Sequence, residues 1–167
     1  MKTLTVAEST QWCTTRGIEL DARGKPRHPG KDLHCLRFEV PASVNRLAWF
    51  CRFIEAKLQP RNHCLLWVTS WGVWESSENW HLYYRLRQSY GDYRLLEEAP
   101  GHLFLGYETH DLVSFLQIGL TAGWDMHLLP SDGYGRAFVS HDGWIELAMV
   151  DAIELDKIKV ELEPQKG

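Results

Sequence analysis

The stretch Leu65–Tyr107 reads LLWVTSWGVWESSENWHLYYRLRQSYGDYRLLEEAPGHLFLGY, and it holds the features that decide the predicted fold. It begins within the continuous apolar run Cys64–Thr69, which is typical of a strand buried on both faces of a sheet. Four of the eight tryptophans and five of the six tyrosines lie inside the stretch. This concentration of aromatic residues indicates either the centre of the core or a recognition surface.

Two helices are predicted after this apolar run. Ser76 or Ser77 is suited to cap the N-terminus of the first helix, and Gly91 is suited to end it. The second helix is predicted from Thr109 to Gly123. Its apolar residues lie on several faces, so we expect it to be the most buried helix of the domain.

A strand, a helix and a further strand are predicted from His34 to Thr69. The alternation of His34–Val40 predicts a strand, and the apolar face of the segment from Ser43 to Leu58 predicts a helix. With Cys64–Thr69 as the next strand, this order predicts a right-handed parallel β-α-β unit. The two strands should therefore be neighbours, or nearly so.

The C-terminal part predicts antiparallel structure. Trp124–Leu129 should form a strand, and the turn His141–Gly143 predicts a hairpin between Arg136–Ser140 and Trp144–Met149. We therefore expect one globular domain over residues 1–167, of the α/β or α+β class, with 152–167 as a charged tail that is either partly helical or frayed. A mixed β-sheet should be packed by three main helices. The expected core residues are Leu36, Phe38, Leu47, Cys51, Ile54, Leu65, Trp67, Leu112, Phe115, Leu116, Leu128 and Phe138.

The composition excludes several classes of protein. With 167 residues and a net charge of −4, the chain lacks the excess of cations that nucleic-acid binding requires, so nucleic acid is an unlikely partner. No apolar run is long enough for a membrane span, and the N-terminus lacks the apolar segment of a secretion signal. We therefore expect a cytoplasmic protein with reduced cysteines. The basic segment Arg23–Lys31 is expected to be a solvated loop.

Two repeated dipeptides suggest metal chemistry at first sight. His34-Cys35 and His63-Cys64 each open a predicted strand, and two cysteines with two histidines are a zinc ligand set. Consecutive strand residues point to opposite faces, so the four side chains should diverge. His110-Asp111 and His141-Asp142 are explained by a helix start and by a turn. We therefore predict no metal and no cofactor.

Catalytic residues are harder to assign. Ser76, Ser77 and Cys13 are possible nucleophiles, but none lies in a recognisable catalytic motif. The alternative to a non-catalytic protein is a small hydrolase or ligand-binding enzyme that uses histidine with a nearby carboxylate. The candidates for this chemistry are His81, His102, His141, Glu78 and Glu98.

The preferred hypothesis is a non-catalytic protein-interaction module, immunity-like or a regulatory partner. Tryptophan, tyrosine and arginine are enriched at the energetic centres of interfaces, and they gather here along one helix and the segment before it. The alternative is that these side chains pack in the core with their polar tips in solvent. A homo-oligomer would bury the same surface against a second copy. The proposed surface consists of Trp71, Trp74, Trp80, Tyr83, Tyr84, Arg85 and Arg87.

The sequence also resembles a group of uncharacterised bacterial proteins. The shared motifs are W-G-x-W-x-S-S-E at Trp71–Glu78, H-L-[FY]-x-R-[FL]-R-x-S-Y-G at His81–Gly91, and E-A-P-G-H-L-F at Glu98–Phe104. The likeness extends from Trp12 to Asp142. The resemblance implies a bacterial, cytosolic, single-domain protein, and it assigns no activity, cofactor or partner to any residue.

Overall fold

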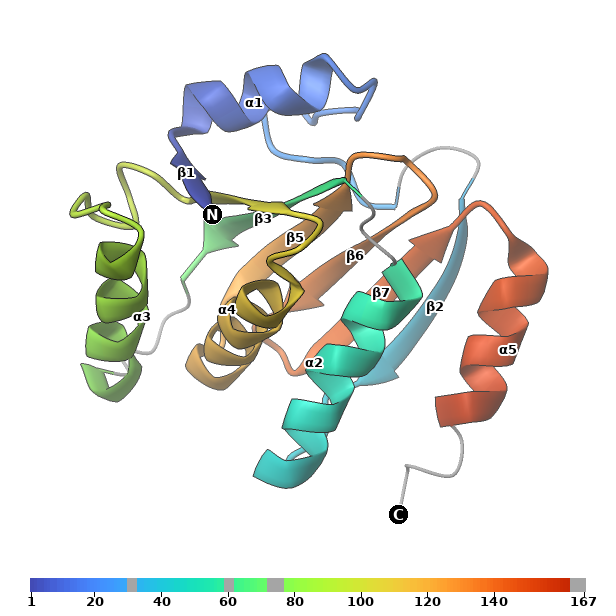
Figure 1. The fold of residues 1–167 in the computed structure, drawn as a ribbon. Helices are drawn as coiled ribbons and strands as arrows, with labels where there is room; N and C mark the ends of the chain where they lie inside the picture. Colours follow the sequence, from blue (N-terminus) through green and yellow to red (C-terminus); the bar gives the residue numbers. More distant parts are fainter. Residues whose placement is uncertain (30–32, 59–61, 72–76, 163–167) are drawn as a thin grey trace.

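Strand β3 (His63–Ser70) lies in the middle of a seven-stranded sheet with the order β1-β4-β3-β5-β6-β7-β2 (Figure 1). The computed structural model describes residues 1–29, 33–58, 62–71 and 77–162. All neighbouring strands of these residues pair antiparallel. The other strands are β1 (Lys2–Leu4), β2 (His34–Glu39), β4 (Gly101–Leu105), β5 (Asp125–Pro130), β6 (Gly135–Ser140) and β7 (Trp144–Met149).

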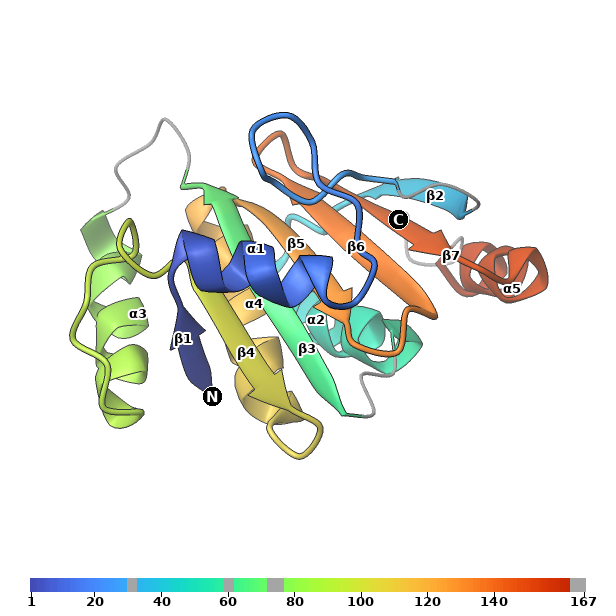
Figure 2. The same cartoon turned by 90° about the horizontal axis from the view of Figure 1, so that it is seen from above.

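Helices cover both faces of the sheet. They are α1 (Val6–Thr14), α2 (Val44–Leu58), α3 (Ser77–Ser89), α4 (Thr109–Ala122) and α5 (Ala152–Leu162). Helix α1 lies alone on one face, which we call the outer face, and α2, α4 and α5 lie on the opposite, inner face (Figures 1 and 2). Helix α3 packs beside α4 at the β1 end of the sheet. No helix of the described residues is both long and apolar enough to cross a bilayer.

Two apolar clusters fill the spaces between these layers. The smaller cluster joins Trp12 and Cys13 of α1 to Leu65 and Trp67 of β3 on the outer face. The larger cluster lies on the inner face, where α2 and α4 pack against each other and against the sheet. Strand β3 contributes to both clusters because its successive side chains point to opposite faces. Its predicted burial on both faces is confirmed.

Local sequence signals explain where several helices begin and end. Helix α1 starts with a capping box, in which the Thr5 hydroxyl accepts from the Glu8 amide and the Glu8 carboxylate accepts from the Thr5 amide. Helix α4 ends at Gly123, whose φ of 67° is left-handed and suits glycine. The predicted hairpin is confirmed, because β6 pairs with β7 across the turn that contains Gly143.

The predicted parallel unit is wrong, and so is the mixed sheet. Among the described residues, strand β2 lies at the edge and pairs only with β7, so β5, β6 and β7 separate it from β3. The strands themselves were placed correctly, but periodicity does not determine which strands pair. The half-exposed alternation of β2 suits an edge, whereas the fully apolar β3 suits the centre.

Two further elements differ from the prediction. Strand β4, which was not predicted, pairs with both β1 and β3. The described residues form five helices, compared with the three main helices expected. Helix α5 lies in the tail that was expected to be partly helical or frayed, and its Leu155, Ile158 and Leu162 are buried. Three expected core residues, Leu36, Phe38 and Phe138, are only half-buried. The nine others are buried, as predicted: Leu47, Cys51, Ile54, Leu65, Trp67, Leu112, Phe115, Leu116 and Leu128.

Gly101 at the start of β4 allows α1 to approach the sheet. A Cβ atom at this position would lie 2.2 Å from Ser9 Oγ and 3.1 Å from Leu4 Cβ. We therefore expect Gly101→Ala to lower the free energy of unfolding by about 1–3 kcal/mol, measured by urea titration, because the core must shift to admit the methyl group. The double variant Ser9→Ala/Gly101→Ala removes the nearest atom and should recover part of this loss. Wild-type stability in Gly101→Ala would contradict the argument.

Candidate interaction surface and buried polar sites

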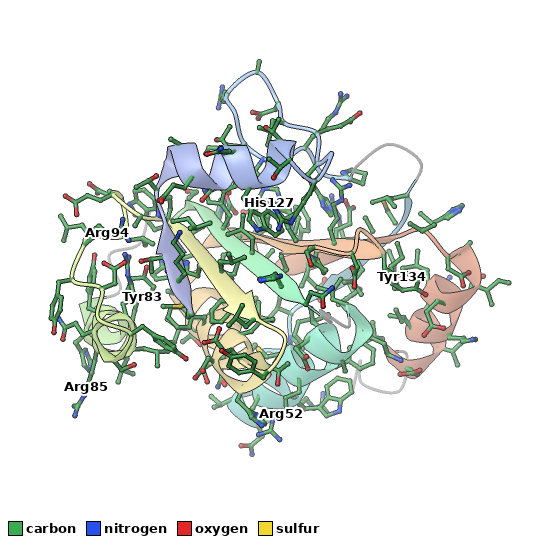
Figure 3. All side chains as sticks on the ribbon, turned by 45° about the horizontal axis from the view of Figure 1, so that its top comes forward. Arg52, Tyr83, Arg85, Arg94, His127 and Tyr134 are labelled. Atoms are coloured by element: carbon green, nitrogen blue, oxygen red, sulfur yellow. The ribbon has the colours of Figure 1, made fainter. Side chains whose placement is uncertain are left out.

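The aromatic surface proposed on α3 is divided between the core and the exterior. Tyr83 and Arg87 are fully buried, as expected from the alternative in which these side chains pack in the core. Figure 3 shows Tyr83 between α3 and the sheet, and Arg85 pointing outward. Tyr84 and Trp71 are half-buried and pack against the larger cluster. Trp74 lies outside the described residues, and so do the side chains of Trp80 and Glu78.

The buried polar residues of α3 form a chain of hydrogen bonds to the sheet. Arg87 Nη1 donates to the Tyr83 hydroxyl over 2.7 Å, and this hydroxyl lies 2.8 Å from His102 Nε2. The Tyr83 oxygen accepts from Arg87, and its hydroxyl can donate to His102 Nε2 when the neutral imidazole carries its proton on Nδ1. Burial, with the nearby Arg87 charge, lowers the pKa of His102 to about 3. His102 is therefore a neutral hydrogen-bond acceptor that fastens α3 to β4.

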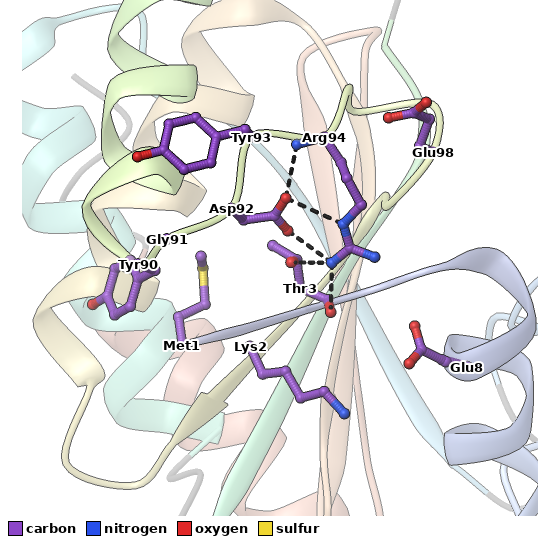
Figure 4. A pocket seen from close by; sticks show the side chains of 10 residues that line it. All are labelled: Met1, Lys2, Thr3, Glu8, Tyr90, Gly91, Asp92, Tyr93, Arg94 and Glu98. Carbon is purple, nitrogen blue, oxygen red and sulfur yellow. Dashed lines mark hydrogen bonds and ion pairs between the residues drawn. The ribbon is translucent and has the colours of Figure 1, made fainter.

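The same network continues to the loop after α3 and closes the β1 edge of the sheet. Asp92 accepts from Arg87 over 3.3 Å and from Arg94 over 2.8 Å. Arg94 also donates to the hydroxyl and the carbonyl oxygen of Thr3 in β1 (Figure 4). Burial alone would raise the pKa of Asp92, but the hydrogen bonds from Arg94 outweigh it and lower this pKa to about 2. The loop is therefore held to β1 by ionised groups.

A cavity of about 620 Å³ lies between β1 and this loop (Figure 4). Its carboxylates already have partners within the protein. Asp92 binds two arginines, Glu8 belongs to the capping box of α1, and Glu98 accepts from the Leu95 amide over 2.9 Å. We therefore interpret this cavity as part of the structural contact that joins the loop after α3 to β1.

The histidines proposed for catalysis lie in separate parts of the fold. His81 is exposed on α3, and His102 is buried in β4. His141 lies in the turn between β6 and β7, 2.9 Å from Asp125. Glu98 lies in the loop before β4, where it is exposed. The structure does not gather these residues into a catalytic site.

The paired dipeptides do not form a metal site. His34 and Cys35 lie on the edge strand β2, whereas His63 and Cys64 lie on β3. Among residues 1–29, 33–58, 62–71 and 77–162, no group of three or more potential ligands is placed to hold a metal ion. Asp111, from the dipeptide at the start of α4, accepts a short hydrogen bond from the Tyr90 hydroxyl.

A second polar cluster, which the sequence analysis missed, lies on the outer face. His28 Nε2 is 3.2 Å from Glu146 Oε1, and the rings of His28 and His127 have centroids 6.2 Å apart. Figure 3 places His127 between α1 and the sheet. With Phe138 and Trp144, these residues line a cavity of about 620 Å³. A histidine in a basic loop and one in a strand gave no sequence signal that they would meet.

The two imidazoles of this cluster are held neutral. Burial lowers the pKa of His28 to about 4 and that of His127 to about 3. Within the described structure, the Nδ1 atoms of both rings have no hydrogen-bond partner. The cluster can thus donate and accept hydrogen bonds, and burying it makes folding sensitive to pH.

We expect acidification to destabilise the protein before its carboxylates titrate. The pKa values of His28, His102 and His127 are lowered in the folded state, so their contribution is complete above pH 6.5. This contribution is lost as the pH falls from 6.5 toward the pKa values of the folded state, because in this range the histidines of the unfolded chain bind protons and those of the folded chain do not. Each histidine should cost up to about 2 kcal/mol at pH 5, measured by urea titration at several pH values.

Two variants control for this pH dependence. His127→Leu should make the loss between pH 7.5 and pH 5 shallower. The pKa of His141 is raised by its hydrogen bond to Asp125, so its contribution has the opposite sign. His141→Gln should therefore make the loss steeper. An unchanged slope in His127→Leu would contradict the assignment of a neutral buried imidazole.

The open edge of the sheet is strand β2. The Val40 amide donates to the Gly143 carbonyl over 2.9 Å, which turns the backbone groups of Val40 toward the β7 side. Because these directions alternate along an antiparallel strand, Leu36 and Phe38 also bond to β7. The N–H and C=O groups of Cys35, Arg37 and Glu39 therefore face outward from the sheet.

A groove with both polar and apolar residues in its lining adjoins this edge. It has a volume of about 690 Å³ and lies between the end of β2, the start of α2 and the end of α5. Trp49 is 39% exposed and stacks on Phe53 with a centroid distance of 5.0 Å. Val44 is 73% exposed at the start of α2. The groove is lined by Phe38, Val40, Trp49, Phe50 and Leu162, among others.

The two edges of the sheet differ in how they are protected. At β1, the strand has three residues and Arg94 binds the Thr3 carbonyl. At β2, six residues pair with β7 in continuous register, without a bulge and without proline inside the strand. Bulges, prolines, covering loops and charged side chains are the usual protection of an edge strand, and of these the described strand β2 has the charged side chains of Arg37 and Glu39. Comparison with known proteins gives no guidance, because no family model, curated protein or solved structure matches the chain.

Proposed function

We propose that the chain is a non-catalytic protein-interaction module of the bacterial cytoplasm, immunity-like or a regulatory partner, that binds an extended protein segment at the edge of β2. The observation that carries this proposal is the outward row of backbone groups at Cys35, Arg37 and Glu39 beside a groove that is lined partly by apolar residues. An added strand satisfies these groups with main-chain hydrogen bonds, and side-chain pockets beside the edge supply specificity.

The groove gives the added segment a place for apolar side chains. Phe38 and Val40 of β2 are half-buried and reach the inner face, where Trp49 and Phe50 of α2 continue the apolar surface. A partner strand places alternate side chains on this face. Apolar residues at alternate positions of the partner would therefore enter the groove, and polar ones would lie beside Arg37 and Glu39.

The catalytic alternative has weaker support. Its candidate histidines and Glu98 lie in separate elements, and His102 is already engaged with Tyr83. The buried cluster of His28, His127 and Glu146 has the residues for acid–base chemistry, but its two imidazoles are neutral and mostly enclosed. Strand addition needs no such group, which is why we prefer it.

Glu39→Pro tests strand addition with little disturbance of the fold. The Glu39 amide faces the open edge, so proline removes a hydrogen bond to the partner strand and none to β7. Glu39→Ala keeps the amide and serves as the matched control. For peptides selected by display on the protein, we expect Glu39→Pro to weaken binding about tenfold or more, as the loss of a buried main-chain bond implies. Glu39→Ala should retain most of the affinity.

Amide hydrogen exchange locates the bound segment in the same experiment. In the free monomer the amides of Cys35, Arg37 and Glu39 should exchange fast, and bound peptide should slow them. The amides of Leu36 and Phe38 should be slow in both states, because they bond to β7. Peptides that bind equally well to Glu39→Pro, or that leave the Arg37 amide unprotected, would contradict the proposal.

A further inference from the structure

The edge strand is complementary to its own sequence when that sequence is reversed. Residues 36–40 read Leu-Arg-Phe-Glu-Val, in which a central aromatic is flanked by a cation and an anion and then by two aliphatic residues. Leu36, Phe38 and Val40 reach the inner, apolar face. Arg37 and Glu39 lie on the outer face, because alternate residues of a strand point to opposite faces.

We propose that the segment bound by β2 is the β2 strand of a second copy of this chain, in antiparallel register about a two-fold axis at Phe38. This inference rests on the proposed strand-addition surface and names its occupant. In this register Arg37 of each copy lies opposite Glu39 of the other, and Leu36 lies opposite Val40. The seven-stranded sheets of the two copies become continuous, with their helices α2, α4 and α5 on one common face.

The backbone directions fit this register. Arg37 and Glu39 both direct their N–H and C=O groups outward, so each opposed Arg37–Glu39 pair exchanges two hydrogen bonds. The central Phe38 pair is then a non-hydrogen-bonded pair, whose side chains approach most closely. The Phe38 ring also contacts Phe50 edge-on, with centroids 5.6 Å apart, so the two grooves meet at the axis.

Other two-fold registers of the same strand are less favourable. A register about Arg37 places this cation opposite itself, and like charges directly opposed destabilise a strand pair. A register about Leu36 places Arg37 opposite Cys35, and Phe38 opposite His34. The register about Phe38 alone opposes unlike charges twice and aliphatic side chains twice.

Arg37 is held in place before a second copy arrives. Its Nε donates to Glu146 Oε2 over 3.3 Å, and its guanidinium lies 3.7 Å from the centroid of the Trp144 ring. The side chain nevertheless stays 56% exposed. A side chain that is already ordered loses less entropy when it forms an ion pair.

Disulfide trapping tests the register directly. In a Cys35→Ser background, Phe38→Cys should cross-link to itself on mild oxidation, because Cα atoms of a non-hydrogen-bonded pair lie about 4.5 Å apart, within the range of a disulfide. Leu36→Cys is the matched control, since it lies opposite Val40 and should give little cross-linked dimer. Efficient cross-linking of Leu36→Cys with none of Phe38→Cys would overturn this register.

Exchanging the charges of Arg37 and Glu39 tests the same register without introducing a cysteine. Sedimentation of the wild-type chain at rising concentration should show a dimer, and Arg37→Glu should raise its dissociation constant about tenfold or more, because two like-charge pairs form. Glu39→Arg should act alike. The double variant Arg37→Glu/Glu39→Arg restores unlike pairs and should recover most of the affinity, whereas failure of this recovery would overturn the register.

The outcomes separate this inference from the proposed function. A wild-type chain that stays monomeric up to millimolar concentration, while display peptides still protect the Arg37 amide, overturns the second copy and leaves strand addition intact. A monomer whose Arg37 amide no peptide protects overturns both. A dimer that Glu39→Pro and the charge variants leave unchanged joins its copies elsewhere, which overturns the inference as well.

Discussion

The double burial of strand β3 is the constraint on which the rest of the structure depends. Five consecutive residues, Cys64 to Val68, are buried, and their side chains alternate between the two faces of the sheet. Both faces therefore need a cover. Helix α1 with the loop behind it supplies the cover for Leu65 and Trp67, and α2 with α4 supplies it for Leu66 and Val68. The strands on either side of β3 extend the sheet to the edge strands β1 and β2, which are more exposed to solvent.

The two ends of the sheet differ in whether their polar groups are hydrogen-bonded within the protein. At the β1 end, Arg87 is buried beside a carboxylate and a phenol that meets a neutral imidazole, and the exposed Arg94 binds the same carboxylate, so α3 and its loop are fixed by directional bonds as well as by apolar contacts. Such a network is stable only if its members are satisfied together. At the β2 end the backbone groups are left to water or to another strand. The chain thus closes one edge firmly and leaves the other open.

Local signals in the sequence were sufficient for most helices and strands. Gly91 and Gly123 ended helices as expected, and the Asp-Gly step made its hairpin. The predicted pairing of β2 was wrong, because the alternation of residues in a strand indicates how the strand is exposed and does not identify its neighbour. Strand β4 was missed because it is short and begins within the Pro100-Gly101 step, which indicates a turn.

The candidate sites were less predictable than the fold. Spacing correctly placed Tyr83 and Arg87 on one side of a helix, but it could not tell that this side faces the sheet, since a charged residue is seldom buried. Their burial depends on His102 and Asp92, which come from other elements. The pairing of His28 with Glu146 likewise arises only from tertiary structure. The open edge of β2 became visible once the strand order was known.

The strand order also determines when β2 can pair during synthesis of the chain. Strand β2 leaves the ribosome early, yet the strand with which it pairs in the described structure is β7, and Arg37 and Glu146 are 109 positions apart. At translation rates of about 5–20 residues per second, β2 waits on the order of 5–20 seconds with both edges unpaired. The strand that stays half open in the finished protein is fully open during this interval. Its charged residues, Arg37 and Glu39, then help to keep the nascent chain from aggregating.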